Sequence, residues 1–211
     1  RLHTLMFPPF ISKEEKKISN VELDKFIKDK KFVFYPAQYW SHKNHRYIVD
    51  AFKKIEDEFY CIFTGINKGN MNFINEYILK NKLSEKIKVY DYLHDSEIRH
   101  LYKNCYAVLF PSYVGSHSFP LFEGFFFDKP VIYNKDTIDK DLEDKVFLLD
   151  INREENLGEI LKYIENNKSL VDKKILLAKE YYKVFFDESN IAKKVANIIN
   201  DYKKFSEKWS N

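Results

Sequence analysis

The sequence has few of the residues that interrupt or cross-link a chain. Its 211 residues include 5 Gly and 6 Pro, which excludes collagen-like, low-complexity and linker-dominated proteins. The 2 Cys exclude a disulfide framework and a zinc knuckle. Because Cys61 and Cys105 lie in or beside apolar runs, we expect two buried, reduced thiols in a cytoplasmic protein.

The sequence is also poor in arginine, and its positive and negative charges nearly balance. Lys and Arg number 35 against 32 Asp and Glu, and only 4 of the basic residues are Arg. Lysine binds phosphate as a point charge, whereas the guanidinium fork of Arg reads base edges. The aromatic residues lie mostly inside apolar runs, where core packing explains them better than stacking on bases. We therefore predict no nucleic-acid partner.

No stretch of about 18 apolar residues is present, so we expect no transmembrane helix. The chain begins with Arg1 rather than Met and has no signal-peptide pattern. At 45% hydrophobic and 32% charged residues, the composition is that of a globular protein. We expect a fragment of a longer cytoplasmic protein.

Short apolar runs alternate with amphipathic segments from residue 32 onward. The segment around Ile48, Ala51, Phe52 and Ile55, for example, has the spacing of one helix face. This alternation indicates βαβ units, and therefore an α/β fold with a Rossmann-like parallel sheet flanked by helices. The runs predicted as strands are Phe32–Tyr35, Tyr60–Thr64, Ile87–Tyr90, Ala107–Phe110, Val131–Tyr133 and Val146–Leu149.

The two ends of the chain differ from this pattern. Residues 12–31 are rich in charge and predict a surface linker or a short helix, and two prolines in residues 5–10 suggest an extended tether. Apolar residues recur at steps of four and three from Ile191 to Trp209, which predicts a last helix with one face buried against either the domain's own flank or a missing partner. We expect residues 1–30 to be a linker from a missing N-terminal domain, 31–186 a Rossmann-like domain, and 187–211 a helical C-terminal tail.

Several common motifs are absent. No G-x-G-x-x-G follows a predicted strand, Gly65-x3-Gly69 lacks the ending of a P-loop, and Ser116 has no nucleophile elbow around it. His42 and His45 have the spacing of two metal ligands, but no third ligand follows at a supporting distance. Surface or capping histidines are the favoured interpretation, and we predict no metal.

Two segments at predicted strand ends carry more information. Residues 35–45 follow the first strand, and Lys43 lies where the next helix opens. Ligands of open parallel sheets bind beyond the carboxyl ends of the strands. An ammonium and free N–H groups at that edge would attract a diphosphate, and a solvated lysine is the alternative.

The second segment, residues 110–124, follows the fourth strand. Its Gly115–Ser118 part is small and polar and would present backbone N–H groups to an anion, and Pro120 suits a first helical turn. Glu123 falls about one turn into that helix, where its carboxylate could accept both hydroxyls of a ribose. The alternative is a glutamate favoured there by the helix dipole.

Together these segments resemble the C-terminal, nucleotide-sugar-binding domain of GT-B retaining glycosyltransferases of family 4, the group 1 glycosyl transferases. The resemblance runs from about residue 31 to 205. It rests on residues 35–45, which are similar to a variant found in polysaccharide and lipopolysaccharide enzymes, and on residues 110–123 and 128–132. Residues 186–190, which open the last helix, also look like the family's ending, where this helix crosses back to the first domain.

The resemblance implies a role for each candidate site residue. Lys43 would neutralise the donor diphosphate, and Glu123 would hold the ribose. Tyr92 and Leu93 would lie along the base. The other donor-binding residues that it implies are Gln38, His42, Gly65, Gly115, Ser116, His117 and Ser118.

Two positions depart from the family pattern. Gln38 stands where the family often has Arg, and Gly115 replaces the first glutamate of its Glu–seven residues–Glu motif. Because the missing glutamate usually contacts the sugar, the donor sugar stays unassigned.

The implied function is the donor-binding half of a retaining glycosyltransferase for polysaccharide or lipopolysaccharide biosynthesis. It would use a nucleotide diphosphate sugar and require no metal or other cofactor. A glycan or lipid-linked acceptor would bind through the missing domain, and the full-length protein would act in the cytoplasm, with peripheral contact at the inner face of the membrane left open. The alternative is a non-catalytic nucleotide-binding or interaction module with the same fold, favoured by Gln38 and Gly115.

Overall fold

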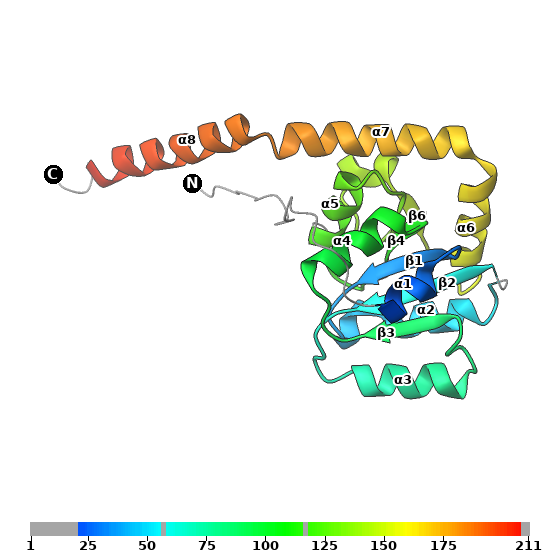
Figure 1. Cartoon of the computed structure of the whole chain (residues 1–211). Coiled ribbons are helices and arrows are strands. Elements are labelled where there is room, and N and C mark those ends of the chain that lie inside the picture. The colour runs from blue at the N-terminus through cyan, green and yellow to red at the C-terminus, as the bar shows by residue number, and fades with distance from the viewer. Residues whose placement is uncertain (1–20, 56–57, 116–117, 208–211) are drawn as a thin grey trace.

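The computed structural model describes residues 21–55, 58–115 and 118–207 of the chain (Figure 1). It contains a six-stranded, fully parallel sheet in the order β3-β2-β1-β4-β5-β6. The predicted α/β fold is therefore confirmed. The strands are β1 Lys31–Pro36, β2 Phe59–Thr64, β3 Ile87–Tyr90, β4 Ala107–Phe110, β5 Val131–Asn134 and β6 Phe147–Leu149.

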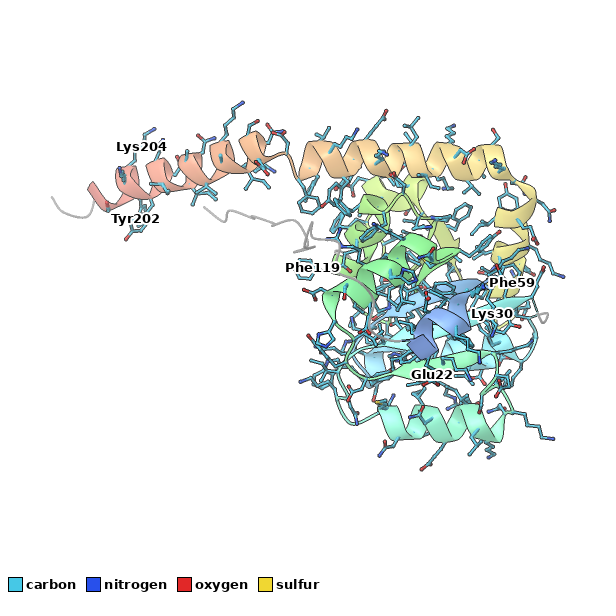
Figure 2. The ribbon with its side chains drawn as sticks, viewed as in Figure 1. Glu22, Lys30, Phe59, Phe119, Tyr202 and Lys204 are labelled. Atoms are coloured by element: carbon cyan, nitrogen blue, oxygen red, sulfur yellow. The ribbon has the colours of Figure 1, made fainter. Side chains whose placement is uncertain are left out.

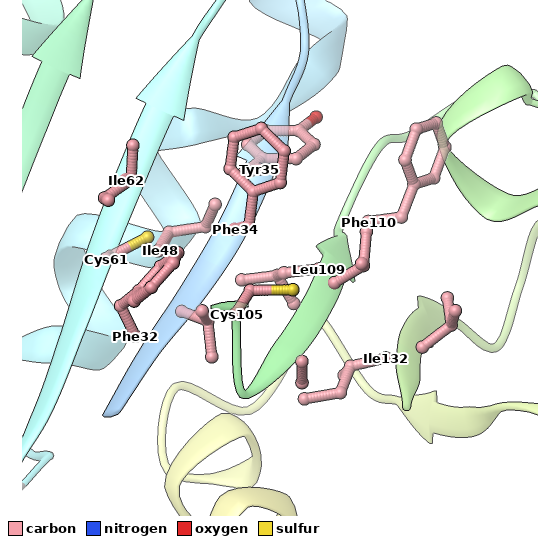
Figure 3. Close-up of a cluster of buried hydrophobic side chains, with 14 of the residues drawn as sticks. Phe32, Phe34, Tyr35, Ile48, Cys61, Ile62, Cys105, Leu109, Phe110 and Ile132 are labelled. Carbon is pink, nitrogen blue, oxygen red and sulfur yellow. The ribbon is translucent and has the colours of Figure 1, made fainter. Parts of the chain in front are cut away.

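The core lies along the central strands. Phe34 of β1 is paired with Ile62 of β2 on one side and Val108 of β4 on the other, and all three are fully buried. Figure 3 shows Cys61 and Cys105 among these apolar side chains. Burial raises the pKa of both thiols, that of Cys105 to about 12, so both stay protonated at neutral pH.

The helices connect successive strands. Those described are α1 Val21–Ile27, α2 His45–Phe52, α3 Met71–Lys80, α4 Asp95–Asn104, α5 Phe119–Phe126, α6 Asn156–Asn166, α7 Lys168–Phe185 and α8 Glu188–Glu207, with the 3₁₀ turns η1 Ser41–Lys43 and η2 Lys140–Lys145. The chain moves from β1 outward to β3, then returns to β4 beside β1 and moves outward again. Because crossovers between parallel strands are right-handed, α2 and α3 cover one face and α4 and α5 the other.

The helix α1 is more closely integrated with the sheet than a linker would be. Of the two alternatives for residues 12–31, a short helix forms, and its Leu23, Phe26 and Ile27 are buried in the same core as the sheet. The sequence pattern did not predict this burial, because the three apolar residues lie among many charged ones. The predicted tether in residues 5–10 lies outside the described residues.

The C-terminal helices differ in their packing. The end of α7 packs on α5, where Phe122 stacks on Phe185 at 6.0 Å and meets Phe186 edge-on at 5.0 Å between ring centroids. By contrast, α8 extends away from the sheet with Tyr202 and Lys204 near its end (Figure 2), and its described side chains are exposed or half-buried. No helix in the described part of the chain combines the length and apolar character needed to cross a membrane.

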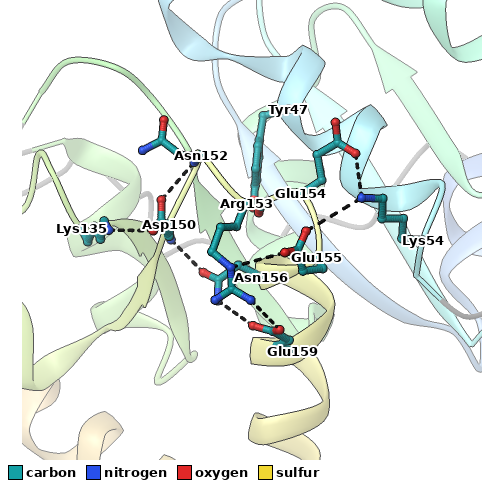
Figure 4. A network of polar contacts seen from close by, with 10 residues as sticks. All are labelled: Tyr47, Lys54, Lys135, Asp150, Asn152, Arg153, Glu154, Glu155, Asn156 and Glu159. Carbon is teal, nitrogen blue, oxygen red and sulfur yellow. Dashed lines mark hydrogen bonds and ion pairs between the residues drawn. The ribbon is translucent and has the colours of Figure 1, made fainter.

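A polar network fixes the start of α6 (Figure 4). Asn156 Oδ1 accepts a hydrogen bond from the Asp150 backbone N–H at 2.8 Å, and Asp150 pairs with Lys135 at 2.7 Å. Arg153 pairs with Glu159 at 2.8 Å. Such exposed ion pairs contribute less than about 1 kcal/mol each, so the network orients α6 more than it stabilises the fold.

Candidate functional site

The carboxyl edges of β1 and β4 meet where the sheet order reverses, which is the ligand-binding position of open parallel sheets. The loops after these two strands are joined by hydrogen bonds. The His42 carbonyl accepts from Ser112 Oγ at 3.1 Å and from the Tyr113 N–H at 2.9 Å, and Asn44 Nδ2 donates to the Pro111 carbonyl at 3.3 Å. The two segments singled out in the sequence therefore form one structural unit.

A cavity of about 490 Å³ lies between these loops. It brings together five of the predicted site residues: Gln38, His42, Lys43, Gly115 and Ser118. Its complete described lining is Pro36, Ala37, Gln38, Trp40, His42, Lys43, Phe110, Gly115, Ser118, Phe119 and Pro120.

Lys43 gives this cavity its positive charge. It ends the 3₁₀ turn η1, one residue before the left-handed Asn44 that precedes α2, rather than lying in the helix itself. Tyr35 holds the turn through a hydrogen bond from its hydroxyl to the Lys43 carbonyl at 2.6 Å, and the Lys43 ammonium lies 5.1 Å from the centre of the Phe110 ring. Partial burial lowers the pKa of Lys43. Among the described lining residues it is the only Lys or Arg, and none is Asp or Glu.

The opposite wall is the loop that precedes α5. Gly115 has φ +107°, a conformation that favours glycine, and its carbonyl accepts a hydrogen bond from the Tyr133 hydroxyl at 2.5 Å. Ser118 is the N-cap residue of α5, and Pro120 lies in the first turn as predicted. The first residues of this helix, Phe119 and Pro120, line the cavity together with Lys43, so the positive end of the α5 dipole faces the same space. Ser116 and His117 lie outside the described residues.

A second cavity of about 260 Å³ adjoins the first. Gly65, Tyr92 and Leu93 line it, as do Asp91 and Ile66, and it shares the segment 36–38 with the larger cavity. The predicted base-binding residues are thus gathered at one place, with Tyr92 exposed and Leu93 buried.

Glu123 is not among the residues that line these two cavities. Its Oε2 accepts a hydrogen bond from the Tyr102 hydroxyl of α4 at 2.5 Å. Burial raises the pKa of Glu123, although the Tyr102 hydrogen bond acts in the opposite direction. The structure therefore places Glu123 between α4 and α5, apart from the group around Lys43.

The two histidines of the suggested metal spacing have different surroundings. His42 is exposed, whereas His45 is fully buried and stacks on Tyr39 at 4.8 Å between ring centroids. Burial lowers the pKa of His45 to about 3, so it is neutral. The interpretation of surface or capping histidines is wrong for His45, which packs in the core. The described residues contain no group of three His, Cys, Asp or Glu able to hold a metal ion.

Sequence reasoning assigned no role to three aromatic residues of the larger cavity, Trp40, Phe110 and Phe119. Trp40 and Phe119 are 43% and 61% exposed, which is unusual for side chains of this size. The available signal was that all three lie within residues 35–45 and 110–124, the two segments at predicted strand ends.

Comparison with known proteins identifies a family. Residues 17–184 match the family described as glycosyl transferases group 1. No curated protein matches the chain.

Solved structures show the same fold at low sequence identity. Anabaena HepE, crystallised with UDP and glucose, has a TM-score of 0.73 and 15% identity over 86% of this chain and 51% of its own. WaaG, a glycosyltransferase involved in lipopolysaccharide biosynthesis, gives 0.66 and 16% over 92% of this chain and 55% of its own. The C-terminal domain of the group 1 protein LpcC from Francisella tularensis gives 0.62 and 12% over 84% and 93%. The chain thus spans about half the length of HepE and WaaG.

Proposed function

Because the chain belongs to the group 1 glycosyl transferases, we propose that it is the donor-binding half of a retaining glycosyltransferase that uses a nucleotide diphosphate sugar. The acceptor is a growing glycan or a lipid-linked glycan of polysaccharide or lipopolysaccharide biosynthesis, bound by a part of the protein beyond this chain. The full-length enzyme acts in the cytoplasm, and its acceptor brings it to the inner face of the membrane.

The observation that carries this proposal is the position of Lys43. An isolated ammonium, uncompensated by any carboxylate among the described lining residues, sits in a cavity at the switch point of the sheet. This arrangement suits a ligand with concentrated negative charge, such as a diphosphate. The adjoining cavity with Tyr92 and Leu93 suits the apolar faces of a base.

The proposed chemistry follows from this charge distribution. When the bond between the sugar and the diphosphate breaks, negative charge grows on the leaving phosphate oxygen. Lys43 and the positive end of the α5 dipole stabilise that charge. Because these groups supply the positive potential, we propose that transfer needs no metal ion.

Retention is proposed without a covalent glycosyl-enzyme intermediate. A double displacement of the kind used by glycosidases needs a pair of carboxylates about 5 Å apart. The described lining of the larger cavity contains no carboxylate, and Glu123 is engaged by Tyr102. We propose that Glu123 binds the donor ribose, although it lines neither of the two cavities.

Two related structures support the substrate class. HepE was crystallised with UDP-glucose, and WaaG is described as a glycosyltransferase involved in lipopolysaccharide biosynthesis.

Titration calorimetry with UDP and GDP, each compared with its nucleoside, tests the donor site. We expect one of the diphosphates to bind at least tenfold more tightly than its nucleoside, because only the phosphates contact Lys43. Failure of both diphosphates to bind would contradict the proposal. NMR of the first-formed product of the full-length enzyme would test retention of the anomeric configuration.

A non-catalytic nucleotide-binding module is the second candidate, because Gln38 is neutral and Gly115 brings no side chain to the sugar. Binding of UDP or GDP without sugar transfer by the full-length protein would favour it.

A further inference from the structure

Gln38 occupies the wall between the two cavities and lines both of them. Its backbone is held from both sides: the Ala37 N–H donates to the Thr64 carbonyl at 2.9 Å, and the Tyr39 N–H donates to the Ile66 carbonyl at 3.2 Å. The Trp40 N–H then folds back onto the Gln38 carbonyl at 2.8 Å. Gln38 thus extends from a tight, anchored turn.

The side chain of Gln38 is oriented by its neighbour. Trp40 Nε1 donates a hydrogen bond to Gln38 Oε1 at 2.8 Å. An indole N–H can only donate, so the carboxamide atom that receives it is the oxygen. The hydrogen bond therefore engages the oxygen of the carboxamide and not its NH2 group, on a residue that lines both cavities.

Trp40 is itself fixed in place. Its ring is nearly parallel to that of His42, at 24° and 6.2 Å between centroids, and the Lys68 ammonium lies 5.9 Å from it. These contacts favour the observed orientation of Trp40, whose indole N–H contacts Gln38.

We propose that Trp40 is a positioning residue of the donor site, which holds Gln38 so that its amide N–H groups donate to the donor diphosphate. Gln38 supplies two neutral donors beside the single charge of Lys43. This inference rests on the proposed function, because the acceptor it names is the diphosphate.

The orientation of Gln38 is measurable without any ligand. Gln38 is the only glutamine in the 211 residues, so glutamine-selective ¹⁵N labelling gives one side-chain amide pair in an NMR spectrum. We expect Trp40→Phe, which keeps a ring but removes the indole N–H, to shift this pair. The matched control Tyr163→Phe, which removes a donor from an exposed aromatic ring on α6, should leave it unchanged. An unshifted pair in Trp40→Phe would overturn the proposal.

A double-mutant cycle then tests the role in binding. We expect Trp40→Phe and Gln38→Ala each to weaken binding of the diphosphate probe, UDP or GDP, by about fivefold, as for one neutral hydrogen bond, with nucleoside binding unchanged. Combining them should cause no further loss, because Trp40 acts through Gln38. Losses that multiply in the double variant, or an unaffected Trp40→Phe, would overturn the inference while leaving the proposed function intact. If neither UDP nor GDP binds the unaltered chain, the proposed function itself is wrong.

Discussion

We expect Lys43 to combine a cost in stability with a gain in diphosphate binding. Burial lowers the pKa of Lys43 in the folded chain below its pKa in the unfolded chain. The unfolded chain therefore binds this proton more tightly, and the charged Lys43 destabilises the fold at neutral pH, which lies below both pKa values. We expect Lys43→Met to raise the melting temperature at pH 7. The same variant should weaken UDP or GDP binding by about 1.5–3 kcal/mol, measured by calorimetry.

Lys80, exposed in the last turn of α3, provides the control. Lys80→Met should change neither quantity. A lower melting temperature in Lys43→Met would mean that the ammonium supports the fold rather than the site.

The contribution of Glu123 to stability depends on pH in the opposite direction to that of Lys43. Burial raises its pKa above the ordinary value of 4.5, so its contribution to stability is full below that value and is lost as pH rises through the folded-state pKa. Glu123→Gln keeps an acceptor for Tyr102 and removes the buried charge. We therefore expect the variant to be more stable than the unaltered chain at pH 7, with the difference vanishing near pH 4, as measured by thermal unfolding.

The assignment of Glu123 to the ribose adds a binding result. Glu123→Gln should weaken nucleotide binding by about 1–3 kcal/mol without loss of fold. Unchanged affinity would limit Glu123 to its contact with Tyr102.

The positions of candidate site residues were predictable from the sequence where the end of a strand decides them. Lys43 and Gly115 follow buried strands, and parallel strands bring their ends to one edge. The partner of Glu123 was not predictable, because Tyr102 lies on another helix and meets Glu123 only through the packing of α4 on α5. The burial of His45 was not predictable for the same reason, because its aromatic neighbours Tyr35 and Phe63 come from two different strands.

At the scale of elements, the contact between the ends of β1 and β2 depends on Gly65. A Cβ there would lie 2.4 Å from the Ala37 carbonyl oxygen, a backbone atom that cannot rotate away. We expect Gly65→Ala to lower the free energy of unfolding by about 2 kcal/mol or more and to weaken UDP or GDP binding, because both cavities share this wall. Chemical denaturation and calorimetry measure the two effects.

Gly158 of α6 is the matched control, since its Cβ would meet only the Ile55 side chain at 3.4 Å. Gly158→Ala should stabilise the helix by up to about 1 kcal/mol. Equal effects of the two substitutions would contradict a special role for the contact at Gly65.

The sheet was predictable because strands buried on both faces are nearly continuous apolar runs, as in β1 and β4. Two elements were harder to predict from the sequence. The helix α1 is only 7 residues long and lies among charges, and the turn η1 has no hydrophobic period that could separate it from α2. Both depend on contacts with segments distant in sequence.

At the scale of the whole molecule, α8 contributes little to the core. Its side chains Ile199, Tyr202 and Phe205 are 49%, 70% and 59% exposed. We expect a chain ending at Asp187 to melt within a few degrees of the full chain. It should also self-associate less in analytical ultracentrifugation, because this apolar face is removed. A large drop in melting temperature would show that α8 stabilises the domain.

The wall of residues 36–38 shared by the two cavities has a consequence for selectivity. A molecule that reaches across this wall anchors one end and so confines its other end to a volume where the effective concentration is millimolar. Its overall affinity then depends on the product of the affinities for the two cavities, whereas a molecule that fills one cavity has only the affinity for that cavity. If the proposed donor spans both cavities, this chelate effect favours the intact donor over a nucleoside or a sugar phosphate, each of which fills only one of them.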